Sequence, residues 1–168
     1  MIVTVAKRSA KARQVGGRPG RGARTAPDLP LITHYVESSA LLAALLEHDA
    51  AARSSIRATG RRVTSALTLA EAARAIVRGR STGRLSEADE RAAARGLQVF
   101  ARRCDLVSVT DPILARVGRP FPVEPVRTLD AVHLATVEQL GEPPALVTVV
   151  TRDGRVRENA RALGYHVE

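Results

Sequence analysis

Short apolar runs rich in Val, Ile and Thr alternate with longer Ala- and Leu-rich stretches from Leu31 to the end of the chain. The apolar runs predict β-strands, and the longer stretches predict helices between them. Strands are expected at residues 31–36, 62–67, 105–109, 145–150 and 165–168. Helices are expected at residues 39–48, 69–80, 86–103, 112–117, 128–140 and 155–163. This alternation predicts an α/β fold in one domain, a three-layer α/β/α sandwich around a mainly parallel central sheet.

Composition narrows the class of protein further. A chain of 168 residues is long enough for one domain with a substantial core. No apolar run approaches the roughly 18 residues that cross a bilayer, so no membrane partner is expected. A single cysteine, Cys104, cannot form an intramolecular disulfide and favours a cytoplasmic location. Two Tyr, two Phe and no Trp argue against an aromatic platform for stacking bases.

The positive charge is concentrated in residues 1–29, which carry seven Lys and Arg side chains against a single acid, Asp28. This segment is rich in Gly and has no sustained apolar period, so it is predicted to be a disordered basic leader. The sequence leaves open whether it is a solvated tail, a nucleic-acid-binding arm, a targeting segment or an upstream extension. The remainder, residues 30–168, contains no lysine. That absence excludes a P-loop lysine or a Schiff-base lysine in the folded domain.

Four carboxylates stand at the end of an apolar run or in the first turns of a predicted helix: Glu37, Glu71, Asp130 and Asp153. The carboxyl ends of parallel strands meet along one edge of a sheet, where ligands usually bind. Acids gathered at that edge repel one another. A bound divalent cation relieves this repulsion, because Mg²⁺ and Mn²⁺ prefer oxygen ligands. The pattern therefore predicts a metal site suited to phosphodiester hydrolysis.

Each acid also has a purely structural interpretation. Glu71 follows Thr68 with the spacing of a capping box, in which the Glu side chain reaches back to the cap amide. Asp153 fits the N-cap of the last helix, and Asp130 in a first helical turn would complement the helix dipole. Glu37 is harder to explain in this way, since one of the two serines that follow it is the more usual cap.

Three side chains close to the acids complete the candidate set. His133 lies one helical turn after Asp130, and packing or hydrogen bonding is favoured for it over metal ligation or base catalysis. Arg127 and Arg152 flank the acids and are candidates to bind phosphate, although arginines without such a role are common on protein surfaces. No Gly-rich loop follows a strand, which argues against a nucleotide cofactor.

Four motifs follow one another in a fixed order. Glu37-Ser-Ser-Ala follows the first predicted strand, and Glu71 follows a Thr-Ser-rich strand end. Arg-x-Leu-Asp-Ala-x-His-Leu-Ala spans residues 127–135, and Thr-x-Asp at residues 151–153 precedes Ala-x-x-x-Gly at residues 160–164. In this order and spacing, the chain resembles the PIN-domain ribonucleases, specifically the VapC toxins of bacterial toxin–antitoxin pairs. The resemblance covers everything except the basic leader.

The resemblance implies a PIN-like nuclease domain at residues 30–168 that acts as a toxin, hydrolysing RNA as a metal-dependent endoribonuclease. The catalytic carboxylates that it implies are Glu37, Glu71, Asp130 and Asp153. All but Glu71 would hold one or two Mg²⁺ or Mn²⁺ ions, and Glu71 would orient a water or bind a second ion. The hydroxyls of Ser39 and Thr151 would fix the carboxylates by hydrogen bonding.

The family also implies partners. A VapC-type toxin acts on RNA, forms a homodimer and is bound by a small VapB-type antitoxin whose basic side chains enter the acidic site. Two functions of other classes remain as alternatives. One is a non-catalytic nucleic-acid-binding module of the same fold, with a weakened metal site and a basic arm. The other is a structural protein whose acids are all helix caps.

One residue departs from the family pattern. The first acid is usually Asp, and here it is Glu37. The extra methylene moves the carboxylate by roughly 1.5 Å, and octahedral Mg²⁺ tolerates little misplacement of its ligands. The sequence therefore leaves open whether the backbone adjusts, Mn²⁺ is preferred or activity is reduced.

Overall fold

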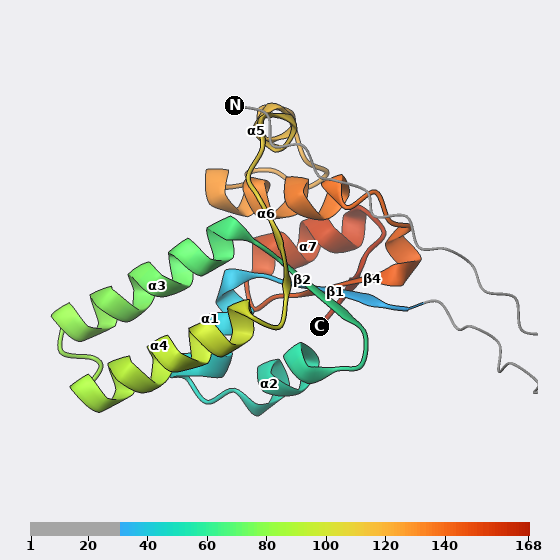
Figure 1. Ribbon diagram of the computed structural model, residues 1–168. Helices are drawn as coiled ribbons and strands as arrows, with labels where there is room; N and C mark the ends of the chain where they lie inside the picture. Colours follow the sequence, from blue (N-terminus) through green and yellow to red (C-terminus); the bar gives the residue numbers. More distant parts are fainter. Residues whose placement is uncertain (1–30) are drawn as a thin grey trace, which may run out of the picture.

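Five parallel strands form the central sheet of the computed structural model, which describes residues 31–168 (Figure 1). The strands are β1 Thr33–Val36, β2 Arg61–Ser65, β3 Asp105–Val107, β4 Val147–Val150 and β5 His166–Val167. Their order in the sheet is β3-β2-β1-β4-β5, and every neighbouring pair is parallel. The predicted basic leader at residues 1–29 lies outside the described residues.

Helices cover both faces of this sheet (Figure 1). On one face, the helices are α1 Ser38–Leu46, α2 Ala50–Arg57, α3 Ala66–Ser81 and α4 Glu87–Ala101. On the other face, they are α5 Asp111–Val117, α6 Thr128–Gln139 and α7 Gly154–Ala162. The predicted single-domain, three-layer α/β/α sandwich with a parallel sheet is thus confirmed. None of the helices between residues 31 and 168 is long and apolar enough to cross a bilayer.

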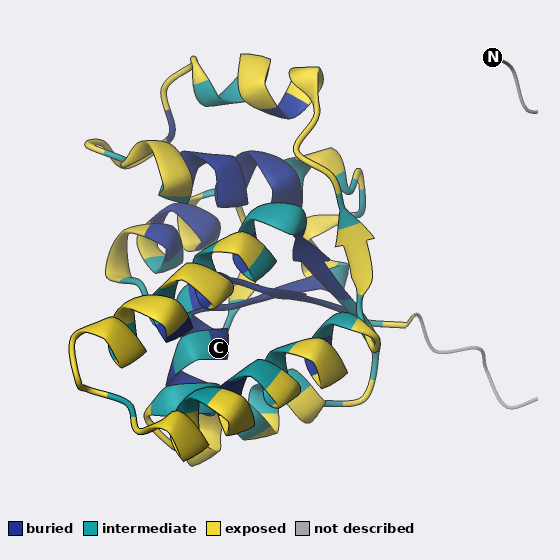
Figure 2. Cartoon of the chain, turned by 60° about the vertical axis from the view of Figure 1, so that its left-hand side comes forward, coloured by how far each residue is buried: buried dark blue, intermediate teal, exposed yellow. Residues whose placement is uncertain are grey.

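Alternate side chains along the strands enter two separate cores. Tyr35 of β1 and Val149 of β4 pack with α5, α6 and α7, whereas Val36 and Val150 pack with α1, α3 and α4. All four side chains are fully buried. Figure 2 shows the central strands and most of α6 in dark blue. Because helices cover both faces, β1 and β4 are buried along their whole length.

The structure corrects several predicted boundaries. The sequence predicts no helix at α2, yet eight residues are helical there, after the Asp49 side chain as N-cap. The second strand, predicted to continue to residue 67, ends at Ser65, whose hydroxyl caps α3 instead. Residues 145 and 146, predicted as strand, belong to the 3-10 turn Pro144–Leu146. The helix predicted at residues 86–103 is present as α4, and Ser86 is its N-cap in a full capping box with Asp89.

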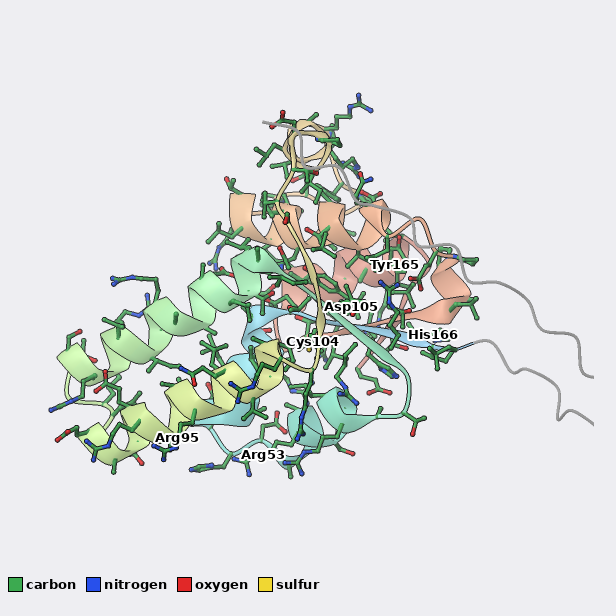
Figure 3. All side chains as sticks on the ribbon, viewed as in Figure 1. Arg53, Arg95, Cys104, Asp105, Tyr165 and His166 are labelled. Carbon is green, nitrogen blue, oxygen red and sulfur yellow. The ribbon has the colours of Figure 1, made fainter. Side chains whose placement is uncertain are left out.

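Cys104 lies just before β3, where α4 leads back to the sheet (Figure 3). Burial raises the pKa of its thiol to about 11, although the charge of Arg62 acts in the opposite direction. A thiol that stays protonated at neutral pH is a poor nucleophile. Cys104 therefore serves as a small side chain packed against the α1, α3 and α4 core.

Candidate active site

The parallel topology brings the four candidate acids to one edge of the sheet. Glu37 follows the last residue of β1, and Asp153 comes three residues after the last residue of β4, which is the neighbour of β1. Asp130 lies in the first turn of α6, and Glu71 lies in the second turn of α3. The elements that carry them begin at the carboxyl ends of the strands, which is where an open α/β sheet forms its ligand site.

Glu37 is the most enclosed of these acids, with 4% of its surface exposed. Its Oε2 accepts hydrogen bonds from the Ser39 amide at 3.0 Å, the Ser39 hydroxyl and the Thr151 hydroxyl at 2.8 Å. Its Oε1 accepts one from the Ser38 hydroxyl at 2.5 Å. The expectation that a serine caps α1 is wrong, because Glu37 itself is the N-cap. The longer side chain allows the carboxylate to turn back over the first turn of the helix.

Ser39 and Thr151 join the end of β4 to the start of α1. The Ser39 hydroxyl oxygen accepts hydrogen bonds from the backbone amides of Arg152 at 2.7 Å and Asp153 at 3.0 Å. The Thr151 hydroxyl oxygen also accepts from the Asp153 amide at 3.0 Å. Both hydroxyls donate to Glu37 at the same time. They therefore fix the Glu37 carboxylate and the backbone that carries Asp153 relative to each other.

Asp153 is the N-cap of α7, as its structural interpretation predicts. Its Oδ1 accepts hydrogen bonds from the amides of Arg155 at 2.8 Å and Val156 at 3.1 Å. Both bonds use the same oxygen. Capping therefore does not occupy Oδ2, and the cap and a metal-binding role are compatible in this residue.

Glu71 is not part of a capping box, so that interpretation is wrong. Helix α3 begins at Ala66 with Ser65 as its N-cap, which places Thr68 inside the helix. The Glu71 Oε2 instead accepts a hydrogen bond from His133 Nε2 at 2.8 Å. Burial alone would raise the pKa of the Glu71 carboxyl, but the interaction with His133 outweighs it and lowers the pKa overall. Glu71 is therefore held as a carboxylate.

His133 brings two of the acids together from the buried face of α6. Its side chain is 1% exposed, and its Nε2 lies 3.6 Å from Glu37 Oε1 as well as 2.8 Å from Glu71. One ligand atom from each of Glu37, Glu71 and His133 lies within 4.8 Å of the other two. The expectation that His133 forms hydrogen bonds is confirmed. The sequence did not indicate its partners, which come from elements far apart in the chain.

Asp130 has the least satisfied carboxylate of the group. Its Oδ2 is buried and has no hydrogen-bond partner among residues 31–168. Burial raises the pKa of Asp130, and the negative charges of Asp153 and Glu37 add to this, with Arg127 and Arg155 partly offsetting them. An unpaired buried oxygen close to two further carboxylates is stabilised by a bound cation. The oxygen donors present fit a hard divalent ion such as Mg²⁺ or Mn²⁺.

The two candidate phosphate-binding arginines differ in their surroundings. The Arg152 guanidinium is half-buried and paired with Asp49, with Nε 2.8 Å from Oδ2. That pair attaches the loop after β4 to the start of α2, so Arg152 is already engaged in the fold. Arg127 is exposed at the N-cap of α6, close enough to Asp130 to influence its pKa. Of the two, Arg127 has the side chain that is accessible to a substrate.

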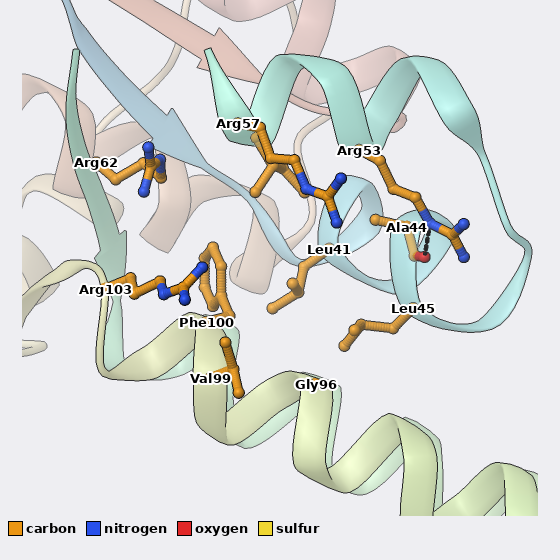
Figure 4. Close-up of a pocket in the computed structure, with 11 residues that line it drawn as sticks. Leu41, Ala44, Leu45, Arg53, Arg57, Arg62, Gly96, Val99, Phe100 and Arg103 are labelled. Atoms are coloured by element: carbon orange, nitrogen blue, oxygen red, sulfur yellow. Dashed lines mark hydrogen bonds between the residues drawn. The ribbon is translucent and has the colours of Figure 1, made fainter. Parts of the chain in front are cut away.

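A separate pocket of about 300 Å³ lies among α1, α2, α4 and β2 (Figure 4). Apolar side chains line most of it, together with four arginines, Arg53, Arg57, Arg62 and Arg103. Arg53 donates to a backbone carbonyl of α1, whereas Arg62 has a buried Nε without a hydrogen-bond partner among the described residues. No acid from the described part of the chain lines this pocket. It is therefore not the hydrolytic centre.

The family model of the PIN domain matches residues 34–162. The chain belongs to the PIN-domain family. The matched segment of this PIN domain contains all four candidate carboxylates. Two relatives from Mycobacterium tuberculosis match it over most of their length. Ribonuclease VapC46 is 37% identical over 135 residues, which cover 79% of this chain and 94% of that protein. Ribonuclease VapC35 is 34% identical over 137 residues, which cover 79% of this chain and 93% of that protein.

Solved structures show the same PIN fold. VapBC2 from Rickettsia felis, bound to a DNA fragment from its promoter, has a TM-score of 0.57 at 14% identity. The alignment covers 82% of this chain and 98% of that chain. The Mycobacterium tuberculosis toxin VapC20, which cleaves the sarcin–ricin loop, has a TM-score of 0.56 at 17% identity, covering 79% and 95%. At these identities, the likeness shows that the PIN domains share a fold.

Proposed function

We propose that this PIN-domain chain is an endoribonuclease that hydrolyses RNA phosphodiester bonds with a divalent metal ion, Mg²⁺ or Mn²⁺, as the toxin of a toxin–antitoxin pair. Relatives named as VapC ribonucleases match along more than nine-tenths of their own length, which supports RNA as the substrate. The observation that carries the metal requirement is Asp130, whose buried Oδ2 has no hydrogen-bond partner within residues 31–168 and lies beside two further acids.

Glu37, Asp130 and Asp153 are the proposed ligands of the ion. Once bound, the ion lowers the pKa of a coordinated water and stabilises charge on the phosphate. The chain prepares the ligands in advance, because the hydroxyls of Ser39 and Thr151 hold Glu37 and the Asp153 backbone in place. Such supporting hydrogen bonds reduce the reorganisation that ligand side chains need on binding.

Glu71 is the proposed acceptor and orienting group for the attacking water. It remains ionised beside His133, and an ionised carboxylate can accept a proton from a water within hydrogen-bond reach. Arg127 is the proposed phosphate contact, because its guanidinium is exposed next to Asp130. For Arg152, which pairs with Asp49, the proposed contribution is to hold the loop after β4.

A metal titration of RNA cleavage tests this function. The full-length chain is purified without divalent ions and incubated with an RNA oligonucleotide mixture under chelator, Mg²⁺ and Mn²⁺. Cleavage is expected with either ion, none with chelator, and none from Asp130→Asn at any metal concentration. Arg95→Gln is the control for handling and folding, because Arg95 is exposed on α4, and its cleavage should equal that of the wild type.

The same experiment separates the alternative functions. A binding module of the same fold would retain RNA in a salt-sensitive manner with no cleavage under any ion. A structural protein would do neither. Cleavage that persists in chelator would remove the metal from the proposal while retaining the ribonuclease.

We further propose that the partner is a VapB-type antitoxin and that the toxin is a homodimer. VapC structures with this fold include a VapBC complex, which supports an antitoxin of that type. The apolar pocket in Figure 4 suits a segment of the antitoxin with apolar and acidic side chains, because four arginines line it. Co-expression with the gene immediately upstream tests the partner, since a stable complex that suppresses cleavage is expected. Light scattering of the isolated chain tests the dimer.

A further inference from the structure

Tyr35, His133 and Glu71 form a continuous hydrogen-bonded chain from the core to the candidate site. The Tyr35 hydroxyl lies 2.9 Å from His133 Nδ1, and His133 Nε2 lies 2.8 Å from Glu71 Oε2. Tyr35 comes from β1, His133 from α6 and Glu71 from α3, so three elements meet here. Tyr35 and His133 are 0% and 1% exposed, which removes water as a competing partner.

The partners of His133 define which atom donates in each bond. Glu71 Oε2 is a carboxylate oxygen and can only accept, so His133 Nε2 carries the proton in that bond, and in a neutral ring Nδ1 then has a lone pair. The phenol can therefore donate to His133 Nδ1, which accepts with its lone pair. A neutral ring that accepts at Nδ1 carries its proton on Nε2, and that atom faces the Glu71 carboxylate. Neither ring nitrogen then has a lone pair left for a metal ion.

We infer that His133 is a positioning residue that fixes the Glu71 carboxylate for hydrolysis and is not itself a metal ligand, with Tyr35 fixing the histidine tautomer. This inference rests on the proposed function, because Glu71 has its role only there. His133 binds Oε2 of Glu71 and does not use the other carboxylate oxygen, Oε1. A side chain needed only for packing would be apolar at this position, as its neighbours Val132 and Leu134 are.

Mn²⁺ binding to the metal-free full-length protein, measured by calorimetry, provides the first test. His133→Phe fills the volume but donates nothing, so Glu71 would no longer be held where it accepts a hydrogen bond from a metal-bound water. Mn²⁺ binding should weaken about tenfold, the lower end for loss of an outer-shell partner. His133→Gln keeps an N–H donor and should restore most of the affinity. Tyr35→Phe should weaken it by less than His133→Phe. Thermal unfolding of each variant establishes that it is folded.

Two matched substitutions control for loss of a buried polar group. His34→Phe removes a buried histidine whose Nε2 lies within hydrogen-bond distance of the Thr59 carbonyl oxygen. His34 directly precedes Tyr35, so its side chain lies on the opposite face of β1. Tyr165→Phe removes a phenol hydroxyl from the residue just before β5, which Figure 3 labels. Both controls should bind Mn²⁺ as the wild type does. Equal weakening in the controls would overturn the inference in favour of a general packing effect.

Electron spin echo spectroscopy of the Mn²⁺-bound wild type gives the second readout. No directly bonded ¹⁴N should be detected, whereas nitrogen coupling that His133→Gln abolishes would make His133 a ligand and overturn the inference. Full Mn²⁺ affinity in His133→Phe would also overturn it. A wild type that binds Mn²⁺ but leaves RNA intact would refute the proposed hydrolysis, and the binding series would still decide the role of His133. A wild type that binds no Mn²⁺ would refute both.

Discussion

At the scale of single residues, Glu37 shows how the chain accommodates an acid one methylene longer than the family's usual aspartate. Four donor groups from Ser38, Ser39 and Thr151 surround its carboxylate in the positions that the longer side chain reaches. The backbone therefore fits Glu, because all four donors already bond the carboxylate where the longer side chain places it. Of the outcomes that the sequence leaves open, this geometry favours a backbone that has adjusted to the longer side chain.

Glu37→Asp should therefore lower RNA cleavage and metal affinity, by about tenfold or more, in both Mg²⁺ and Mn²⁺. The shorter side chain falls short of the Thr151 hydroxyl. Folding should survive, since Asp is itself a preferred N-cap. Parallel metal titrations of wild type, Glu37→Asp and Glu37→Gln measure the effect. Higher activity of Glu37→Asp in Mg²⁺ would show that the longer side chain is strained, and indifference to both changes would place Glu37 outside the site.

Asp130→Asn should raise the thermal stability of the metal-free protein at neutral pH or leave it unchanged. The folded pKa of Asp130 is raised, chiefly by burial and then by the charge of Asp153. The folded state then holds the proton more tightly than the unfolded chain. The stability of the wild type therefore falls as pH rises from the ordinary pKa of an aspartate through the raised pKa of Asp130. The advantage of the variant should accordingly disappear below the ordinary pKa of an aspartate.

Unfolding curves of both proteins from pH 3 to pH 8, with and without Mn²⁺, provide the measurement. Mn²⁺ should stabilise the wild type and not the variant, because ligands that bind only the folded state raise its stability. A variant that is less stable at pH 7 without metal would mean that Asp130 makes a favourable contact in the absence of a cation.

At the scale of elements, strands were the easier part of the fold to predict. β4 is Val-Thr-Val-Val and is buried on both faces, and its β-branched residues indicate a strand. α2 escaped prediction because its eight residues carry two arginines and two serines, and only Ala52 among them is buried. It depends on context, namely the Asp49 cap and the bond from Arg53 to the Ala44 carbonyl. The start of α3 was missed because Ala66 and Leu67 are apolar and continue the sequence of β2 without a break.

The turn from α2 into β2 depends on Gly60. Its φ is +146°, and a Cβ at this position would lie 2.3 Å from the Ile32 carbonyl oxygen and 2.9 Å from the His34 ring. Gly60→Ala should therefore lower the free energy of unfolding by about 2–4 kcal/mol, from backbone strain and displacement of β1. Gly118→Ala is the control, because its nearest contact would be 3.6 Å and its φ is ordinary.

Urea unfolding of both glycine variants gives the comparison. Gly118→Ala should stay within about 0.5 kcal/mol of the wild type. Equal stability of the two variants would mean that the backbone of β1 and β2 adjusts around Gly60 at little cost in free energy. Cleavage by the folded fraction of Gly60→Ala should be retained, since the turn lies at the amino-terminal end of the strands, opposite the candidate acids.

At the scale of the whole molecule, the gathering of the four acids followed from parallel topology and could be expected before any coordinates. Their individual contacts could not. The pairing of Glu71 with His133 joins residues 62 positions apart through the packing of α3 beside α6. The ion pair between Arg152 and Asp49 joins residues 103 positions apart. It depends on α2, which the sequence did not reveal. Local pattern thus locates the acids, whereas long-range packing decides what each one touches.

The last prediction concerns the basic residues 1–29. The sheet, both cores and the candidate site lie within residues 31–168, and Leu31 at the start of the described segment is 64% exposed. Deleting residues 1–29 should therefore leave the thermal unfolding midpoint and the metal-dependent cleavage of a short RNA unchanged. Nucleic-acid affinity should fall and depend less steeply on salt, because seven cationic side chains are lost.

Affinity for an RNA oligonucleotide is measured with Asp130→Asn in both the full and shortened chains, so that cleavage does not interfere. Substituting the same seven cationic residues by Gln in the full chain is the matched control, and it should reproduce the deletion. Full affinity in the Gln control but not in the deletion would assign the effect to something other than charge. An insoluble shortened chain would instead mean that residues 1–29 contribute to folding, against the expectation from their Gly-rich, weakly apolar composition.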